Sequence, residues 1–151
     1  MISILRTFTS FGALGRLPGA PGTYGSLATL PLAYIWALLV GEQHLWTLGL
    51  LVILSVFGTI ASSIVERHLG TEDPSEIIID EVVGQWIALL AVPMAWPYWL
   101  AAFVLFRVFD IWKPWLIGRV QDLHGGLGIM LDDILAGLLA FLLIQGVAAP
   151  L

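Results

Sequence analysis

The sequence predicts an all-α fold: a polytopic integral membrane helical bundle with about five transmembrane helices, in a single domain over residues 1–151. Of the 151 residues, 59% are hydrophobic and 11% are charged, and the mean hydropathy is +0.95. Long uncharged runs alternate with short polar segments, as expected of a chain that crosses a bilayer repeatedly. The charged residues gather mainly in three stretches, residues 16–26, 66–81 and 106–133.

The chain contains no cysteine, which excludes disulfides, thiolate nucleophiles and cysteine-ligated metals. Residues 1–16 lack the long apolar core of a signal peptide. We interpret Met1–Leu14 as an amphipathic segment at the membrane surface.

Two apolar segments come first. Leu27–Val40 follows a Gly/Pro-rich loop, Leu17–Ser26, and its helix is expected to begin near Ser26 with a hydroxyl N-cap. After a short connection, Gly41–His44, the uncharged segment Leu45–Val65 is long enough to span a bilayer.

The third helix has a start signal of its own. Asp73–Glu76 (DPSE) has the pattern of an N-cap, a proline at the first helical position and a capping box. This pattern predicts a helix from Pro74 to about Val92, with Asp80 and Glu81 well past its first turn.

The last two helices flank a polar loop. Tyr98–Trp112 is expected to be helical and to end or kink at Pro114. Trp115–Gly128 is expected to be a loop, and Ile129–Val147 a final helix that opens with two aspartates.

The basic residues predict the orientation of this bundle. With five spans, all six fall on the side of the N-terminus, which the positive-inside rule assigns to the cytoplasm. They are Arg6, Arg16, Arg67, Arg107, Lys113 and Arg119. A four-span alternative, in which Leu27–Val40 is re-entrant, would split these residues between the two sides.

One basic cluster is suited to phosphate. Arg107, Asp110 and Lys113 are spaced by three and therefore share a helix face. Arg107 and Lys113 would bind phosphate oxygens, and Asp110 would hold Arg107 or bind a metal. The alternative is a snorkelling basic pair with one ion-paired aspartate.

Two acidic pairs, Asp80/Glu81 and Asp132/Asp133, open toward the same side in this arrangement. Clustered carboxylates repel one another unless a cation or a proton joins them, and hard oxygen ligands suit Mg²⁺. The alternative for Asp132/Asp133 is a favourable interaction with a helix dipole.

Glycines support close packing and anion binding. Gly84 and Gly137 lie four residues after an acidic residue, which predicts close contact between their helices. Two glycine-rich loops precede helices, where backbone N–H groups can bind an anion, although plain turns are an equal alternative. The phosphate-binding candidates in these loops are Thr23, Ser26, Gly125 and Gly126.

These groups together indicate a membrane-embedded, metal-dependent enzyme that acts on a phosphorylated lipid. A small cation- or proton-coupled transporter that uses the same carboxylates is the alternative from another class. A non-catalytic subunit that binds anionic lipid is a further one.

Four motifs, in order, resemble those of the bacterial phosphatidylglycerophosphatase A family. They occupy residues 21–27 (PGTYGSL), 79–86 (IDEVVGQW), 106–115 (FRVFDIWKPW) and 125–137 (GGLGIMLDDILAG). One departure is Leu116, where the family usually has proline.

The resemblance implies an enzyme, a Mg²⁺-dependent phosphatase of the bacterial inner membrane, with its active site on the cytoplasmic face and no nucleic-acid partner. It would hydrolyse phosphatidylglycerophosphate to phosphatidylglycerol and phosphate, in phospholipid synthesis. Either water or an aspartate would attack phosphorus. The expected catalytic residues are Asp80, Glu81, Asp110, Asp132 and Asp133. Metal ligands are expected at Asp80, Glu81, Asp132 and Asp133, and phosphate ligands at Arg107, Lys113, Thr23, Ser26, Gly125 and Gly126.

Overall fold

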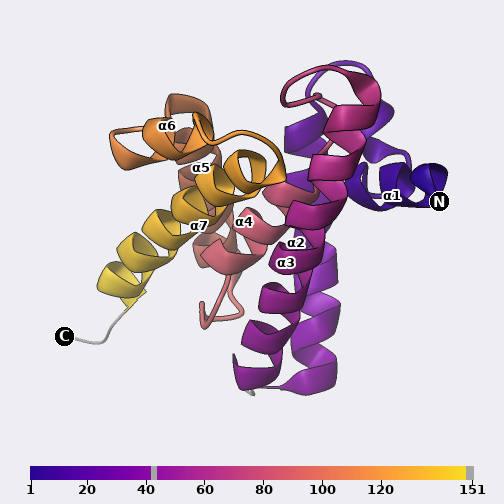
Figure 1. Ribbon diagram of the computed structural model, residues 1–151. Helices are drawn as coiled ribbons and strands as arrows, with labels where there is room; N and C mark the ends of the chain where they lie inside the picture. Colours follow the sequence, from indigo (N-terminus) through magenta and orange to yellow (C-terminus); the bar gives the residue numbers. More distant parts are fainter. Residues whose placement is uncertain (42–43, 149–151) are drawn as a thin grey trace.

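The computed structural model describes residues 1–41 and 44–148, and this part of the chain is helical with no strand. Figure 1 shows the helices arranged as a bundle, with the short helices α1 and α6 toward one end. The helices are α1 (Ile2–Thr9), α2 (Pro21–Val40), α3 (His44–Leu69), α4 (Ile79–Ala88), α5 (Trp96–Trp112), α6 (Leu116–Gln121) and α7 (Gly126–Ala148). A 3₁₀ turn, η1 (Leu14–Arg16), precedes α2.

Three of these helices, α2, α3 and α7, are long and apolar enough to cross a membrane. Helix α4 has 10 residues, which at ~1.5 Å per residue is about half the thickness of a bilayer core. Helix α5 has 17 residues and is also short of a full span. The predicted all-helical membrane bundle is supported, but only three of the five expected full spans are.

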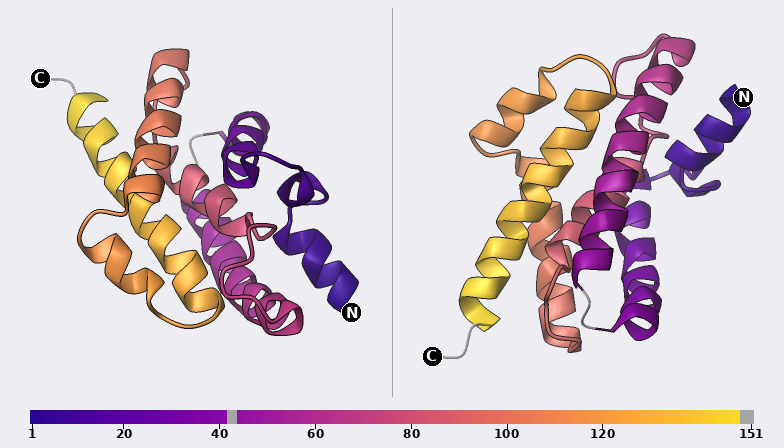
Figure 2. Two further views of the ribbon diagram at one scale, coloured as in Figure 1. Left: turned by 90° about the horizontal axis from the view of Figure 1, so that it is seen from above. Right: turned by 60° about the horizontal axis from the view of Figure 1, so that its bottom comes forward.

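Helices α4 and α7 form the centre of the bundle. Helix α7 packs against α3, α4, α5 and α6, and α4 packs against α2 as well. Figure 2 shows α4 enclosed between the longer helices. Phe106, Ala136 and Ala140 are fully buried in the apolar core around this contact. Short α4 therefore carries its polar first turn into the interior of the bundle.

Two glycines allow α4 and α7 to approach closely. A Cβ atom on Gly84 would lie 2.5 Å from the Phe106 ring and 2.6 Å from the Asp133 carbonyl oxygen. A Cβ atom on Gly137 would overlap the backbone of Gly84. The predicted close packing at these two glycines is confirmed.

The predicted helix start at Asp73–Glu76 is wrong. Residues 70–78 form a loop, and Asp73 has a left-handed backbone conformation with φ 44°. Glu76 does not cap a helix, because Arg6 donates to both its carboxylate oxygens at 2.8 Å. This ion pair with α1 takes the place of the local capping box.

A second bond holds the same loop. The Ile78 N–H donates to the Thr9 carbonyl oxygen at 2.9 Å, so α4 begins only at Ile79. Asp80 and Glu81 consequently lie in the first turn of α4, not well past the first turn of a longer helix.

Three other boundaries differ from the sequence-based expectations. Helix α2 begins at Pro21 and includes most of the predicted glycine loop, because proline at the first helical position suits a helix start. The predicted loop 115–128 contains α6. Helix α7 begins at Gly126, so Asp132 and Asp133 lie inside it and do not open it.

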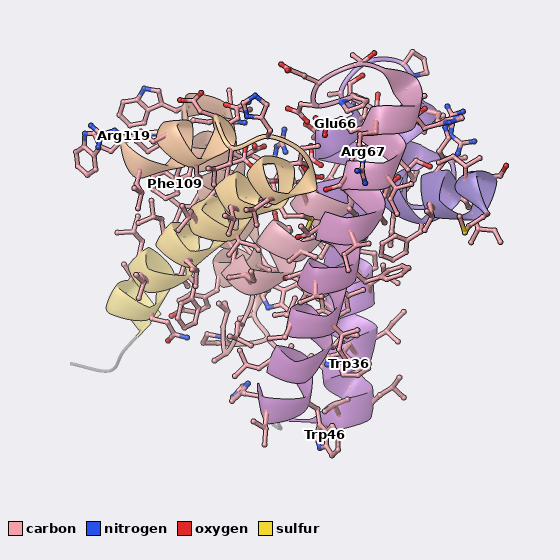
Figure 3. The ribbon with its side chains drawn as sticks, in the orientation of Figure 1. Trp36, Trp46, Glu66, Arg67, Phe109 and Arg119 are labelled. Carbon is pink, nitrogen blue, oxygen red and sulfur yellow. The ribbon has the colours of Figure 1, made fainter. Side chains whose placement is uncertain are left out.

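The two ends of the bundle differ in polarity. Figure 3 places Glu66, Arg67 and Arg119 toward one end and Trp36 and Trp46 toward the other. Residues 42 and 43, which belong to the expected connection between α2 and α3, lie outside the described residues.

The outer surfaces of the long helices are apolar. Leu38, Leu39, Val52 and Ile53 are more than half exposed, on α2 and α3. Such a surface is large for a protein in water and is suited to contact with lipid chains.

Candidate active site

Three carboxyl groups from two helices meet inside the bundle. Asp80 and Glu81 come from the first turn of α4, and Asp133 comes from α7. One oxygen of each lies within 4.8 Å of the others. We refer to Asp80, Glu81 and Asp133 as the carboxylate trio.

Two members of the trio are almost removed from solvent, and Glu81 is half-buried. Asp80 is 8% exposed and Asp133 is 2% exposed. The Oδ1 atom of Asp80, the Oε2 atom of Glu81 and the Oδ2 atom of Asp133 are buried without a hydrogen-bond partner among the described residues. Three buried carboxylates this close are stable as anions only with a cation between them, so the trio is suited to a small hard cation.

Burial and the neighbouring charges also raise the pKa values of the two carboxyl groups on α4. Burial is the main cause that raises the pKa of Glu81 to about 7, and the negative charge of Asp110 adds to it while Arg107 opposes it. Burial, followed by the charges of Glu81 and Asp133, raises the pKa of Asp80 well above its usual range. Without a cation, these two groups therefore retain protons at a pH where exposed carboxyls are ionised.

Asp132 lies beside the trio and is engaged by other groups. Its Oδ2 atom is 2.5 Å from the Lys113 Nζ atom, and its Oδ1 atom accepts the Asp133 N–H at 3.0 Å. The structure thus gives Asp132 the position of an anchor for Lys113. Its role as a metal ligand stays a prediction.

The last turns of α5 supply a guanidinium group. The Arg107 Nη1 atom lies 2.6 Å from Asp110 Oδ2 and donates a long hydrogen bond of 3.5 Å to Ser26 Oγ. The Arg107 Nε atom is buried and has no partner among the described residues. Asp110 therefore holds Arg107, as the spacing of the two residues predicted.

The first turn of α2 closes the site on another side. A Cβ atom on Gly22 would overlap the Glu81 carboxylate and lie 3.1 Å from Arg107 Nη1, so a larger residue here would displace the Glu81 side chain. Thr23 is half-buried in the same turn, and Ser26 follows one turn later. The N–H groups at the start of a helix lack partners within that helix and favour an anion.

The second glycine loop lies against α3. The Gly126 N–H donates to Ser63 Oγ at 2.9 Å, and a Cβ atom on Gly126 would lie 2.7 Å from the Ser63 nitrogen. Gly125 lines an open groove of about 980 Å³, together with Glu66 and His124. The structure gives these glycines a packing position, and their predicted contact with phosphate stays a prediction.

Sequence reasoning missed three contributors to the site. They are Gly22, which admits Glu81, the Arg6–Glu76 pair, which holds the loop before α4, and Gln85, which is fully buried one turn after Glu81. Gln85 had a signal in the sequence, since a lone amide in an apolar helix is unusual, and Gly22 lies in one of the glycine-rich loops described above. The Arg6–Glu76 pair depends on contact between distant segments.

Comparisons with known proteins agree on a family. A sequence model described as Phosphatidylglycerophosphatase A matches residues 7–148. The chain is 40% identical over 133 residues to the phosphatidylglycerophosphatase A of Escherichia coli, covering 86% of this chain and 74% of that protein. It is 39% identical over 136 residues to the Haemophilus influenzae protein of the same name, covering 89% and 82%.

A third relative has a different name. The chain is 46% identical over 142 residues to a Bacteroides thetaiotaomicron protein provisionally named a phosphatidylinositol-3-phosphatase, covering 90% of this chain and 87% of that protein. No solved structure matches the chain.

Proposed function

The chain belongs to the phosphatidylglycerophosphatase A family of phosphatases, and from this membership and its carboxylate trio we propose that it is a Mg²⁺-dependent lipid phosphatase. It hydrolyses the terminal phosphomonoester of phosphatidylglycerophosphate and yields phosphatidylglycerol and inorganic phosphate. The transporter alternative finds no support in the relatives, which are named as phosphatases.

One observation carries the proposal: the carboxylate trio lies beside Arg107. Three buried carboxyl oxygens without partners are suited to a divalent cation, and the guanidinium of Arg107 is suited to a phosphate. Gly22 brings Glu81 and Arg107 together. The site therefore has separate groups for the cation and for the anion of a metal-assisted phosphatase.

Asp80, Glu81 and Asp133 would hold Mg²⁺, with Asp132 and Asp110 adjacent to them. When bound, Mg²⁺ supplies positive charge that neutralises the phosphate oxygens and draws electrons from phosphorus. The oxygen-only donor set of the trio fits this ion, since the chain offers no thiolate and the trio contains no histidine.

The basic residues bind and orient the substrate. Arg107 presents a planar fork to the phosphate oxygens, and Asp110 fixes its direction at 2.6 Å. Lys113 supplies a compact positive charge from its position beside Asp132. Both groups also stabilise the negative charge that spreads over the oxygens in the transition state.

Hydrolysis transfers the phosphoryl group to water. The oxygen of water forms a bond to phosphorus, the bond from phosphorus to the lipid oxygen breaks, and a carboxylate of the site accepts the proton from water. The departing lipid oxygen takes up a proton and becomes a hydroxyl. The alternative is a covalent aspartyl-phosphate. Phosphate bound to an aspartate after an acid-quenched single turnover would contradict direct attack by water.

The proposed location is the bacterial cytoplasmic membrane, with the site facing the cytoplasm. The three apolar helices support a membrane protein. The orientation rests on the basic residues, which favour the cytoplasmic side.

A second candidate substrate is phosphatidylinositol 3-phosphate, because of the name of the Bacteroides relative. Both lipids carry a phosphomonoester on a polyol headgroup. Parallel assays with the two lipids at equal surface concentration would separate the two assignments by their ratio of kcat/KM.

The test is phosphate release from phosphatidylglycerophosphate by purified protein in detergent, with Mg²⁺ or with EDTA. We expect release that requires Mg²⁺ and that Asp80→Asn and Asp133→Asn abolish. Asp122→Asn is the matched control, because Asp122 is exposed and lies outside the trio. No release from folded wild-type protein on either lipid would reject the proposed function.

A further inference from the structure

Gln85 is a buried amide that the proposed mechanism leaves without a role. It lies on α4, it is 0% exposed, and neither its Nε2 nor its Oε1 atom has a hydrogen-bond partner among the described residues. A buried polar group without a partner destabilises the folded protein. A bound molecule beside Gln85 would supply the missing partners.

Helix geometry directs this amide toward the carboxylate trio. Gln85 follows Glu81 by four residues, so the two side chains lie on the same face of α4. Side chains on a helix tilt toward its N-terminus, which here is the end that carries Asp80 and Glu81. The Gln85 amide thus extends from one turn deeper in the bundle toward the level of Glu81.

The helix that packs against α4 also carries buried polar side chains. Helix α2 packs against α4, and its Ser26 and Thr29 are both 0% exposed. The two hydroxyls donate to backbone carbonyls of α2 at 2.9 Å, so they retain only acceptor positions. Buried polar side chains therefore occur on α2 as well as on α4.

The unpartnered buried atoms of Arg107, Gln85 and the trio include both donors and acceptors. Arg107 Nε and Gln85 Nε2 are donors, whereas the free oxygens of the trio are acceptors. A cation satisfies the carboxylate acceptors, and an acceptor oxygen, such as that of a phosphate, satisfies the donors. A phosphate group with its metal ion satisfies both sets together, which a water molecule alone would not do.

We propose that Gln85 is a substrate-binding residue whose Nε2 amide donates a hydrogen bond to an oxygen of the phosphomonoester, from the side of the bundle interior. This inference rests on the proposed function and identifies an additional contact of that site. Arg107 on α5 and Gln85 on α4 then both bind the phosphate. The bond strengthens as charge develops on the oxygens, so its loss lowers kcat more than it raises KM.

The test uses the full-length protein in detergent and the variant Gln85→Met, which keeps the size of the side chain and removes the amide. We expect kcat to fall by about 10- to 100-fold and the inhibition constant for inorganic phosphate to rise. The melting temperature should be unchanged or higher, because an unpartnered polar group is lost from the interior. A residue with a merely structural role would lower the melting temperature together with activity.

Gln145→Met is the matched control. Gln145 Nε2 donates to the Ala91 carbonyl at 2.9 Å, so this variant should lose stability and keep the wild-type inhibition constant for phosphate. Wild-type kcat and phosphate inhibition in Gln85→Met would overturn the inference, as would a lower melting temperature in that variant.

A second substitution tests the hydrogen-bond donor without changing the size of the side chain. Gln85→Glu keeps the shape and replaces the donor with an oxygen that repels phosphate, so wild-type activity in Gln85→Glu would also overturn the inference. Inactive wild-type protein would reject the proposed function itself, whereas an active wild type with equally active Gln85 variants would reject only the role of Gln85.

Discussion

The side chains of Lys113 and Asp132 join the end of α5 to the interior of α7, with Lys113 Nζ 2.5 Å from Asp132 Oδ2. The Asp132 side chain is 5% exposed, and its other oxygen accepts the N–H of Asp133. Lys113 itself has a left-handed backbone conformation, with φ 46°, where the chain leaves α5. The pair therefore fixes a basic group next to the carboxylate trio.

The first prediction concerns this pair. Lys113→Met leaves the Asp132 carboxylate buried without a counter-ion, which should lower the free energy of unfolding by about 2–3 kcal/mol and reduce phosphate release. Adding Asp132→Asn should restore most of the stability but not the activity. Thermal unfolding and phosphate release of the single and double variants provide the measurement.

Arg119→Met is the control for the loss of one basic residue, since Arg119 is exposed on α6. It should leave stability and activity near those of the wild type. Equal melting temperatures for Lys113→Met and the wild type would show that the pair adds nothing to stability.

The second prediction concerns the metal. Mg²⁺ should raise the melting temperature of the wild-type protein in proportion to the logarithm of its concentration above the dissociation constant. Asp80→Asn should remove this increase, because it removes one of the three converging oxygens. In EDTA the same variant should be at least as stable as the wild type, since Asp80 is buried beside two other carboxyls.

Differential scanning fluorimetry with and without Mg²⁺ measures both effects. An undiminished Mg²⁺ response in Asp80→Asn would place the cation elsewhere. Asp122→Asn should keep the full response and serves as the matched control.

The third prediction concerns pH. The pKa of Glu81 is raised from 4.5 to about 7, mainly by burial, so between these values the folded metal-free protein holds a proton that the unfolded chain has lost. The contribution of Glu81 to the free energy of unfolding is therefore complete below about pH 4.5 and falls as the pH rises from there through 7. The raised pKa of Asp80 acts in the same direction.

Melting temperatures measured in EDTA over this pH range test whether stability falls as the pH rises. Glu81→Gln cannot ionise at this position, so its curve should be flatter than that of the wild type. Mg²⁺ should reduce the loss at neutral pH by compensating the ionised carboxylates. A wild-type stability that rises with pH over this window would contradict the buried position of Glu81.

The fourth prediction concerns the contact of α4 with α7. A methyl group at Gly84 would lie 2.5 Å from the Phe106 ring and 2.6 Å from a backbone oxygen of α7. Gly84→Ala should therefore destabilise the protein by about 1–3 kcal/mol and displace Asp133 from the trio, which lowers activity. Gly49→Ala is the control, because nothing lies within 4 Å of its added methyl group.

Thermal unfolding and phosphate release separate the two glycines. The exposed Gly49 substitution should be neutral or slightly stabilising, since alanine favours helix more than glycine does. Wild-type stability in Gly84→Ala would contradict this prediction, because α4 and α7 would then have to separate at no cost in free energy.

Much of the fold followed from local patterns. The apolar runs predicted the all-helical bundle, and three helices are long enough to span a membrane. The prediction failed where a contact between distant segments competes with a local signal. The capping box predicted at Asp73–Glu76 does not form, because Glu76 pairs with Arg6 on α1. Helix lengths failed for the same reason, since α4 begins only where that loop ends.

The sequence by itself determined the all-helical class, the family and the set of charged residues from which the site is built. These depend on composition, on the spacing of apolar residues and on motifs that are local in the chain. Only the tertiary structure decided which carboxyls converge. It brings Asp80 and Glu81 to Asp133 and turns Asp132 toward Lys113. The physical reason is that the separation of charged groups on different helices depends on how closely the backbones pack, here at Gly22, Gly84 and Gly137.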